Sequence, residues 1–211
     1  IGIGYQAGDS LSTGTYNILI GRDAGQTLTT GGNNHLMGAY TETSAADSSH
    51  QIVHGYNVTG YSDNCFTFGN AGNDTAIGYG NTTWIAPSDE RMKEEITTST
   101  AGLSFVNDLR PVTFKWKKEK DIPTDLKGYV EGSEKRYKTD TTEHGFIAQE
   151  VKTVIDAHSE LKDGFTMWGE GSDGRQRIGD GALVPMLVKA IQELSAKNEA
   201  LLTRIEVLEN A

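Results

Sequence analysis

The sequence predicts an α+β protein in which a repetitive β-structured stem precedes a mixed α/β domain that ends in a long helix. Three observations lead to this fold class. Residues 1–87 are rich in glycine and repeat themselves, residues 88–211 have the charge density of a globular domain, and a heptad pattern runs over about 183–209. We therefore place a domain boundary at 87/88.

Charge separates the two parts. The chain has 211 residues and a net charge of −10, which argues against nucleic acid as a partner. Up to Pro87, Arg22 is the only basic residue, whereas the remaining basic residues and most acidic residues follow Ser88. Cys65 is the only cysteine, and no apolar run is long enough to cross a bilayer, so we expect neither an internal disulfide nor membrane insertion.

The stem repeats with a period of 17 residues, because Gly4, Gly21, Gly38 and Gly55 are evenly spaced at that interval. Short apolar strands are expected at 18–20, 35–37 and 51–53, each followed by glycine and a polar turn. One such unit cannot bury its apolar face alone. The units must either stack along an axis or wind around identical chains, and we expect a trimeric β-helix or β-roll rod rather than a flexible linker.

The second part is expected to alternate helices and strands. A helix over 101–109 would present Leu103, Val106 and Leu109 on one face, and an alternating strand over 112–116 follows Pro111. Residues 117–140 are polar and are expected to form a long loop or hairpin, and 144–155 a strand that enters a helix. Strands at 165–168 and 176–178 could pair across the glycine-rich turn between them.

The C-terminal segment carries the pattern of a coiled coil. Apolar residues alternate at spacings of four and three, with one asparagine among them, and the predicted seam consists of Leu187, Ile191, Leu194, Asn198, Leu201, Ile205 and Leu208. A polar residue such as Asn198 in an apolar seam commonly sets register and oligomer number. The alternative is a single amphipathic helix packed on its own domain.

Four motifs together resemble the C-terminal intramolecular chaperone domain of phage tail spikes, endosialidases and neck appendages. They are SDERMK at 88–93, LRPV at 109–112, GFIAQEV at 145–151 and LVPMLVKAIQEL at 183–194. The preceding repeats resemble those of phage tail fibres and trimeric adhesin heads. The resemblance implies a domain that trimerises, helps an upstream β-structured fibre to fold, and is then released by autoproteolysis.

The resemblance places the catalytic pair on Ser88 and Lys93 and the cleavage site at Pro87 and Ser88, with Asp89 and Arg91 orienting the segment. A lysine that is neutral can take the proton of a serine hydroxyl, which makes a single-turnover serine endopeptidase acting in cis or across the trimer. Five residues of regular helix or strand cannot bring the two side chains together. Either a turn intervenes, or Lys93 meets Ser88 of a neighbouring chain. The alternative role for Ser88 is that of a helix N-cap.

The expected partners are two further copies of the chain, an upstream fibre or spike domain, and a host cell-surface receptor for the stem. We expect no cofactor and no bound metal, because the histidines show no ligand spacing. Trp84 is expected to be a packing residue. The resemblance implies a virion location, with the chaperone part released in the host cytoplasm. The alternative function is a permanently attached trimeric receptor-binding or adhesin tip.

Overall fold

The computed structural model describes residues 1–162 and 164–210 and divides into two compact units, Ile1–Ile96 and Thr97–Ala211. Residues 88–96 thus belong to the first unit by their contacts, although the predicted boundary at 87/88 separates them from it. The reason is that this segment lies against the last hairpin of the stem.

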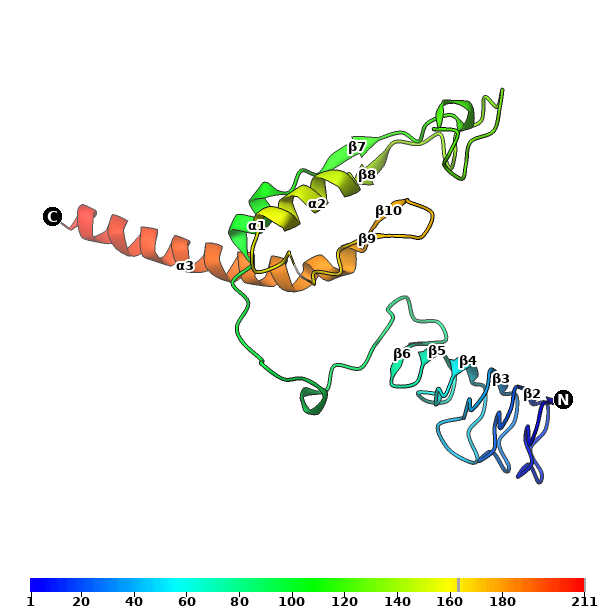
Figure 1. The fold of residues 1–211 in the computed structure, drawn as a ribbon. Coiled ribbons are helices and arrows are strands. Elements are labelled where there is room, and N and C mark those ends of the chain that lie inside the picture. Colours follow the sequence, from blue (N-terminus) through cyan, green and yellow to red (C-terminus); the bar gives the residue numbers. More distant parts are fainter. Residues whose placement is uncertain (163, 211) are drawn as a thin grey trace. The chain divides into compact units, whose positions relative to one another are not determined.

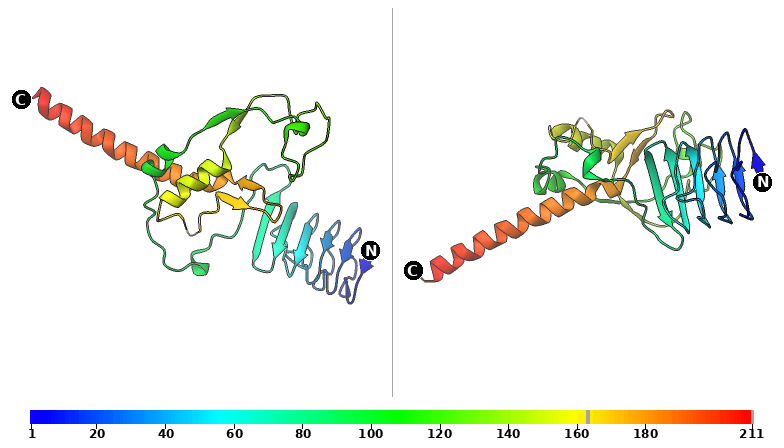
Figure 2. Two further views of the ribbon diagram at one scale, coloured as in Figure 1. Left: turned by 45° about the horizontal axis from the view of Figure 1, so that its top comes forward. Right: turned by 90° about the horizontal axis from the view of Figure 1, so that it is seen from below.

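The first unit is a β-solenoid-like sheet made by one chain. Its six strands lie side by side in chain order, as Figures 1 and 2 show. They are β1 (Gly2–Ile3), β2 (Ile18–Ile20), β3 (His35–Met37), β4 (Ile52–Tyr56), β5 (Cys65–Asn70) and β6 (Asn73–Gly78). β1 to β5 are parallel, and β6 returns antiparallel to β5. The first four strands pair at an offset of 17 residues, for example Ile18 with His35 and His35 with Ile52. The predicted period and the strands at 18–20 and 35–37 are therefore confirmed, whereas the strand predicted at 51–53 runs over Ile52–Tyr56. The units stack side by side within one chain.

Alternation along the short strands divides each coil into an inner and an outer side. Leu19, Leu36 and Val53 occupy equivalent positions and are at most 2% exposed, so they form a column of apolar side chains inside the coils. Their strand neighbours Met37 and Ile52 are exposed. The sequence pattern of one apolar residue between two outward residues is what a two-residue side-chain period requires.

A second column inside the solenoid is polar. Asn34 is completely buried; its amide donates to Asn17 Oδ1 (3.1 Å) and to the Ser48 carbonyl (2.8 Å), while its Oδ1 accepts from the Gln51 N–H (3.0 Å). Asn17 and Gln51 are also buried, at 4% and 1% exposure. The ladder satisfies backbone groups at the corners of successive coils, where no strand partner is present.

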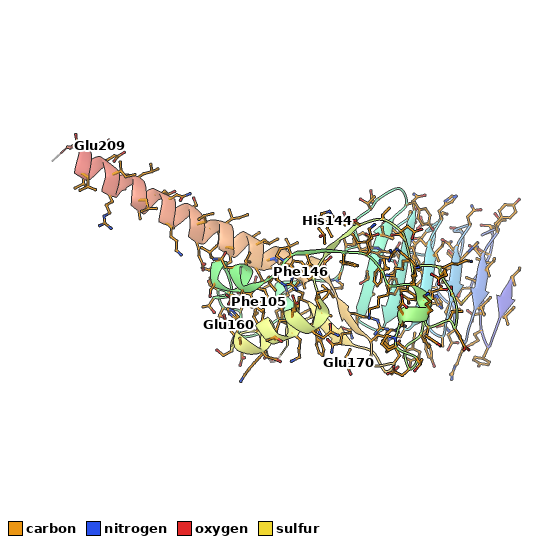
Figure 3. All side chains as sticks on the ribbon, turned by 90° about the horizontal axis from the view of Figure 1, so that it is seen from above. Phe105, His144, Phe146, Glu160, Glu170 and Glu209 are labelled. Carbon is orange, nitrogen blue, oxygen red and sulfur yellow. The ribbon has the colours of Figure 1, made fainter. Side chains whose placement is uncertain are left out.

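The second unit contains two antiparallel two-stranded sheets, three helices and a hydrophobic core. Its elements are α1 (Leu103–Asp108), β7 (Val112–Phe114), β8 (Glu143–Gly145), α2 (Ala148–Ala157), β9 (Trp168–Glu170), β10 (Gln176–Ile178) and α3 (Val184–Glu209), with 3-10 turns η2 (Glu119–Asp121) and η3 (Asp180–Leu183). β7 pairs antiparallel with β8, and β9 with β10. Phe105, on α1 in Figure 3, is fully buried with Val151 and Ile155 of α2.

Several details of the second unit differ from the sequence-based expectation. The buried face of α1 is centred on Phe105, whereas Leu103 and Val106 are only half-buried, because α2 contributes the core residues that cover Phe105. The strand expected at 165–168 begins instead at Trp168. The long loop carries η2 and a single bridge between Lys118 and Arg136.

Helix α3 is packed at its beginning and exposed beyond. Ala190 is buried, and the Glu193 carboxylate accepts the Leu103 N–H at 2.9 Å, which satisfies a free donor at the start of α1. Further along, Leu201 and Ile205 are 56% and 49% exposed. Glu209 marks the end of this extended part in Figure 3. The helix itself is confirmed, and its C-terminal half is not packed on its own domain. Over the residues that the structure describes, no helix is both long and apolar enough to cross a membrane.

Candidate functional site

The segment that contains the predicted cleavage site is tied to the last hairpin of the stem. Ala76 of β6 and Ile85 exchange two backbone hydrogen bonds, of 2.9 and 2.8 Å. The Trp84 ring meets the rings of Phe66 and Phe68 edge-on, at centroid distances of 5.9 and 5.4 Å. Trp84 is thus a packing residue on β5, as expected, although it stays 48% exposed.

Ser88 and Lys93 lie in contact within one chain. The Lys93 Nζ donates a hydrogen bond to the Ser88 Oγ at 2.7 Å. The 3-10 turn η1 (Glu90–Met92) reverses the chain between them, so of the two routes that the spacing left open, the intervening turn is the one observed. No neighbouring chain is needed to bring the two atoms together.

Asp89 caps this turn, and Ser88 does not. The Asp89 carboxylate accepts the Arg91 N–H at 2.9 Å, and it also pairs with the Arg91 guanidinium through Nε (2.9 Å) and Nη2 (2.5 Å). These hydrogen bonds to Arg91 lower the pKa of Asp89, and the carboxylate raises the pKa of Arg91. Asp89 and Arg91 therefore shape the turn that joins Ser88 to Lys93. Ser88 is therefore not the N-cap residue of this turn, in contrast to the alternative role considered above.

An open cavity of about 390 Å³ surrounds the pair. One side consists of Pro87, Ser88, Met92 and Lys93, and the other is formed by the turn and first residues of β6, at 72–75. Asn73, Asp74 and Thr75 were not among the site residues predicted from the sequence. Their spacing from Ser88 gave no such indication, because they reach the site only where β6 turns back antiparallel to β5.

Ser88 and Lys93 are both exposed to solvent in the single chain. Within the described ranges, Lys93 takes part in no ion pair, since its only side-chain partner is the serine hydroxyl. A lysine acts as a base only in its neutral form, which a low-dielectric surrounding favours. The two atoms lie within hydrogen-bond distance, with the lysine as donor, and both side chains are open to solvent.

The other predicted site residues lie elsewhere. All seven coiled-coil seam residues are on α3, in the second unit, and lie apart from the Ser88 turn in the chain. No cluster of three or more potential metal ligands is found among residues 1–162 and 164–210. A larger cavity of about 580 Å³ in the second unit is lined by Trp116, Tyr137 and several lysines and arginines, with no serine or cysteine in its lining.

Comparison with known proteins identifies the second part of the chain. Residues 88–160 match the peptidase S74 family, described as chaperone of endosialidase. The match begins at Ser88, the residue in contact with Lys93, and it includes the LRPV and GFIAQEV motifs at 109–112 and 145–151. No curated protein matches the chain. The match supports an intramolecular chaperone domain of the endosialidase type in the second part of the chain.

Proposed function

We propose that residues 88–211 trimerise, direct the folding of a phage tail-fibre or tail-spike stem, and then release themselves by cutting the bond between Pro87 and Ser88. The observation that carries this proposal is the 2.7 Å contact between Lys93 Nζ and Ser88 Oγ at the first residue of the family match. The family supports a chaperone role and peptidase activity.

The chaperone step follows from the contacts that the stem must make. Every strand pair from β1 to β4 joins residues 17 apart, so each coil closes a loop before its apolar residues are buried. Association of three copies through the exposed seam of α3 would hold three stems by one fixed end. Coil formation in each chain could then start from that fixed end.

The cleavage step uses only groups of this chain and water. A neutral Lys93 Nζ takes the Ser88 Oγ proton while Oγ attacks the Pro87 carbonyl carbon. The bond from that carbon to the Ser88 nitrogen then breaks, and Lys93 returns the proton to the leaving nitrogen. Water hydrolyses the resulting ester, which leaves a Pro87 carboxylate on the stem and a free amine and hydroxyl on Ser88. One cut per chain separates the stem from its chaperone.

We propose that assembly of the chains activates the pair of Ser88 and Lys93. In the resting geometry the amine donates to the hydroxyl, whereas catalysis needs an amine that accepts from it. Burial of the exposed pair by a neighbouring subunit would favour the neutral amine and would exclude water from the reacting atoms. The stem would remain on the virion, and the chaperone part would be left in the host cytoplasm. Further partners of the stem would be an upstream fibre domain and a host receptor.

The decisive experiment compares the wild-type chain with Ser88→Ala and Lys93→Gln by intact mass and denaturing gels. We expect the wild type alone to give a fragment that begins at Ser88 and a stem that ends at Pro87. Ser10→Ala is the matched control, because Ser10 is an exposed stem serine and its loss should leave cleavage unchanged. Brief hydroxylamine treatment, which cleaves esters, should convert any accumulated ester to a Pro87 hydroxamate.

A permanently attached receptor-binding tip is the second candidate. The solvent-exposed position of the pair favours it, because an exposed amine is a poor base. Two intact chains in the wild type and the Ser88→Ala variant, under conditions where the protein is assembled, would support the tip and contradict autoproteolysis.

A further inference from the structure

We infer that a row of three tyrosines and one arginine along one edge of the stem binds an uncharged polysaccharide. The row consists of Tyr5, Arg22, Tyr40 and Tyr56, whose side chains contact one another in this order. The inference rests on the receptor-binding part of the proposed function, for which it names the site and the class of ligand. It does not depend on cleavage at Ser88.

The repeat of the coils places the four residues at the same corner of successive coils. Tyr5, Arg22 and Tyr56 each directly follow a glycine that marks the period, and Tyr40 lies one position further along. Backbone hydrogen bonds join these corners, because the Asp23 N–H donates to the Tyr5 carbonyl (2.8 Å) and the Tyr40 N–H to the Arg22 carbonyl (2.9 Å). Neighbouring strands lie about 4.8 Å apart, so three steps extend the row over about 14 Å. A row of this length on a fixed backbone suits an extended polymer of repeating units.

The side chains of the row hold one another and remain open to solvent. The Arg22 guanidinium carbon lies 5.7 Å from the centre of the Tyr5 ring and 5.6 Å from that of Tyr40. The rings of Tyr40 and Tyr56 meet edge-on, with their centres 5.8 Å apart. Tyr5 and Tyr56, at the two ends of the row, are 67% and 55% exposed. The rings are therefore ordered before a ligand arrives, which lowers the entropy cost of binding.

Arg22 is fixed through one nitrogen and offers its other donors to a ligand. Its Nε donates to the buried Asp23 carboxylate at 3.1 Å, and among residues 1–162 and 164–210 its two Nη atoms have no hydrogen-bond partner. The N–H groups of a guanidinium form a planar fork, from which two neighbouring sugar hydroxyls can accept. The face of an aromatic ring is negative and attracts the C–H groups of a sugar ring. Exposed rings beside a free fork of donors thus match the two kinds of surface that a saccharide presents.

The charge of the stem selects against an acidic polysaccharide. Arg22 is the only basic residue among residues 1–87, which contain six acidic residues, and its charge is paired with Asp23. The summed field of this part is therefore negative and repels a polyanion. A cationic polymer would meet the Arg22 guanidinium in the middle of the row. An uncharged polysaccharide avoids both repulsions and still supplies hydroxyl acceptors and C–H groups.

The test measures the binding of the assembled, uncleavable Ser88→Ala chain to dextran, mannan and galactan in native affinity gels, with alginate as the acidic probe. We expect at least one uncharged polymer to retard the protein and alginate not to do so. Tyr56→Ala should weaken the binding by at least about tenfold, and Tyr56→Phe should retain most of it, because the ring remains. Tyr16→Ala is the matched control. Tyr16 is 81% exposed on the same stem, but it precedes β2, whereas the residues of the row end or follow their strands.

Arg22→Lys tests the role of the guanidinium fork. Lysine keeps the positive charge but presents it as a single point, without the planar pair of Nη donors. We expect the affinity for the uncharged polymer to fall by about tenfold. Tyr5→Ala, at the open end of the row, is the second ring variant if Tyr56→Ala does not fold. Binding that survives Arg22→Lys and the ring variants unchanged would overturn the inference.

The thermal midpoint and oligomeric state of each variant separate ligand binding from folding and assembly. Both should stay at the values of the Ser88→Ala parent. A Tyr56→Ala chain that dissociates would identify the row as a contact between copies of the chain and would overturn the inference. Stronger binding to alginate than to the uncharged polymers, or binding to none of the four, would also overturn it.

The outcome for this site is distinguishable from the outcome for cleavage. A wild-type chain that cuts itself at Ser88 but binds no polysaccharide would leave the proposed autoproteolysis standing and remove this site. A chain that binds an uncharged polymer through the row but is never cut would remove the autoproteolysis and retain the site.

Discussion

At the scale of single residues, the repeat depends on glycines that have no room for a side chain. Gly4, Gly21, Gly38 and Gly55 all have φ between 131° and 145°, a region that L-residues rarely adopt. A Cβ on Gly38 would lie 1.6 Å from the Gly55 carbonyl oxygen, and one on Gly21 would lie 2.4 Å from that of Gly38. Each glycine therefore allows the next coil to approach, which explains why the period of 17 residues is marked by glycine.

Gly38→Ala should lower the free energy of unfolding of the stem by at least about 2 kcal/mol, because it adds backbone strain to a direct clash between coils. Chemical denaturation followed by circular dichroism measures the change. Gly72→Ala is the control, since an added Cβ there meets no atom within 4 Å. Equal stabilities for the two variants would show that the coils can separate to admit the methyl group.

At the scale of elements, α1 and α2 are joined by a histidine between two carboxylates. His158, directly after α2, has Nε2 at 2.9 Å from Asp108 of α1 and Nδ1 at 3.3 Å from Glu160, and its ring meets Phe105 edge-on. The hydrogen bond with Asp108, followed by the interactions with Glu160, raises the pKa of His158 above its ordinary value of 6.5. The charged imidazole also lies at the C-terminal end of α2, where a helix dipole favours a cation.

The second unit should therefore lose stability as the pH rises from 6 to 8.5. A histidine with a raised pKa in the folded state stabilises fully below its unfolded pKa of about 6.5, and this contribution disappears as the pH passes the folded value. Thermal unfolding of the full chain at pH 6.0 and 8.5 measures the effect, and His158→Gln should reduce the difference. His144→Gln, which alters an exposed histidine, should not. An unchanged pH dependence in His158→Gln would contradict this origin.

At the scale of the whole molecule, both units leave an apolar surface without a partner in the single chain. On α3 the exposed apolar residues include those of the predicted seam, of which Ile191 and Leu208 are 67% and 69% exposed. On the stem, Met37, Ile52 and Phe68 lie on the outer side of the sheet and are also exposed. Surfaces of this kind favour association, and the proposed trimer would cover the seam of α3.

Leu201→Lys should convert the assembly to monomers and stop cleavage, because a charge in the seam would be buried in the trimer. Leu202→Lys is a close control, because Leu202 is 60% exposed but lies outside the seam. Sedimentation velocity gives the oligomeric state, and intact mass gives the extent of cleavage. A Leu201→Lys monomer that still cuts itself would rule out activation by assembly, and a stable Leu201→Lys trimer would rule out the seam.

The features that depend on local spacing could be predicted from the sequence alone. The 17-residue glycine period located the strands, the four-three spacing located the helix over 184–209, and the motifs at 88, 109 and 145 pointed to the family. Each of these signals comes from residues close together in the chain. Strand register and helix periodicity follow from local geometry, and for that reason they were predictable.

Contacts between residues that are distant in the chain could not be predicted and become visible in the folded structure. The spacing allowed Lys93 to meet Ser88 either of its own chain or of a neighbouring chain. In the structure, the turn capped by Asp89 brings the two side chains of one chain together. Asn73 and Asp74 lie across the cavity from Ser88 because β6 turns back along β5. Phe105, and not Leu103, is buried in the core because α2 packs against that side of α1. These contacts depend on how segments distant in the chain pack together, and a local sequence pattern carries no information about that packing.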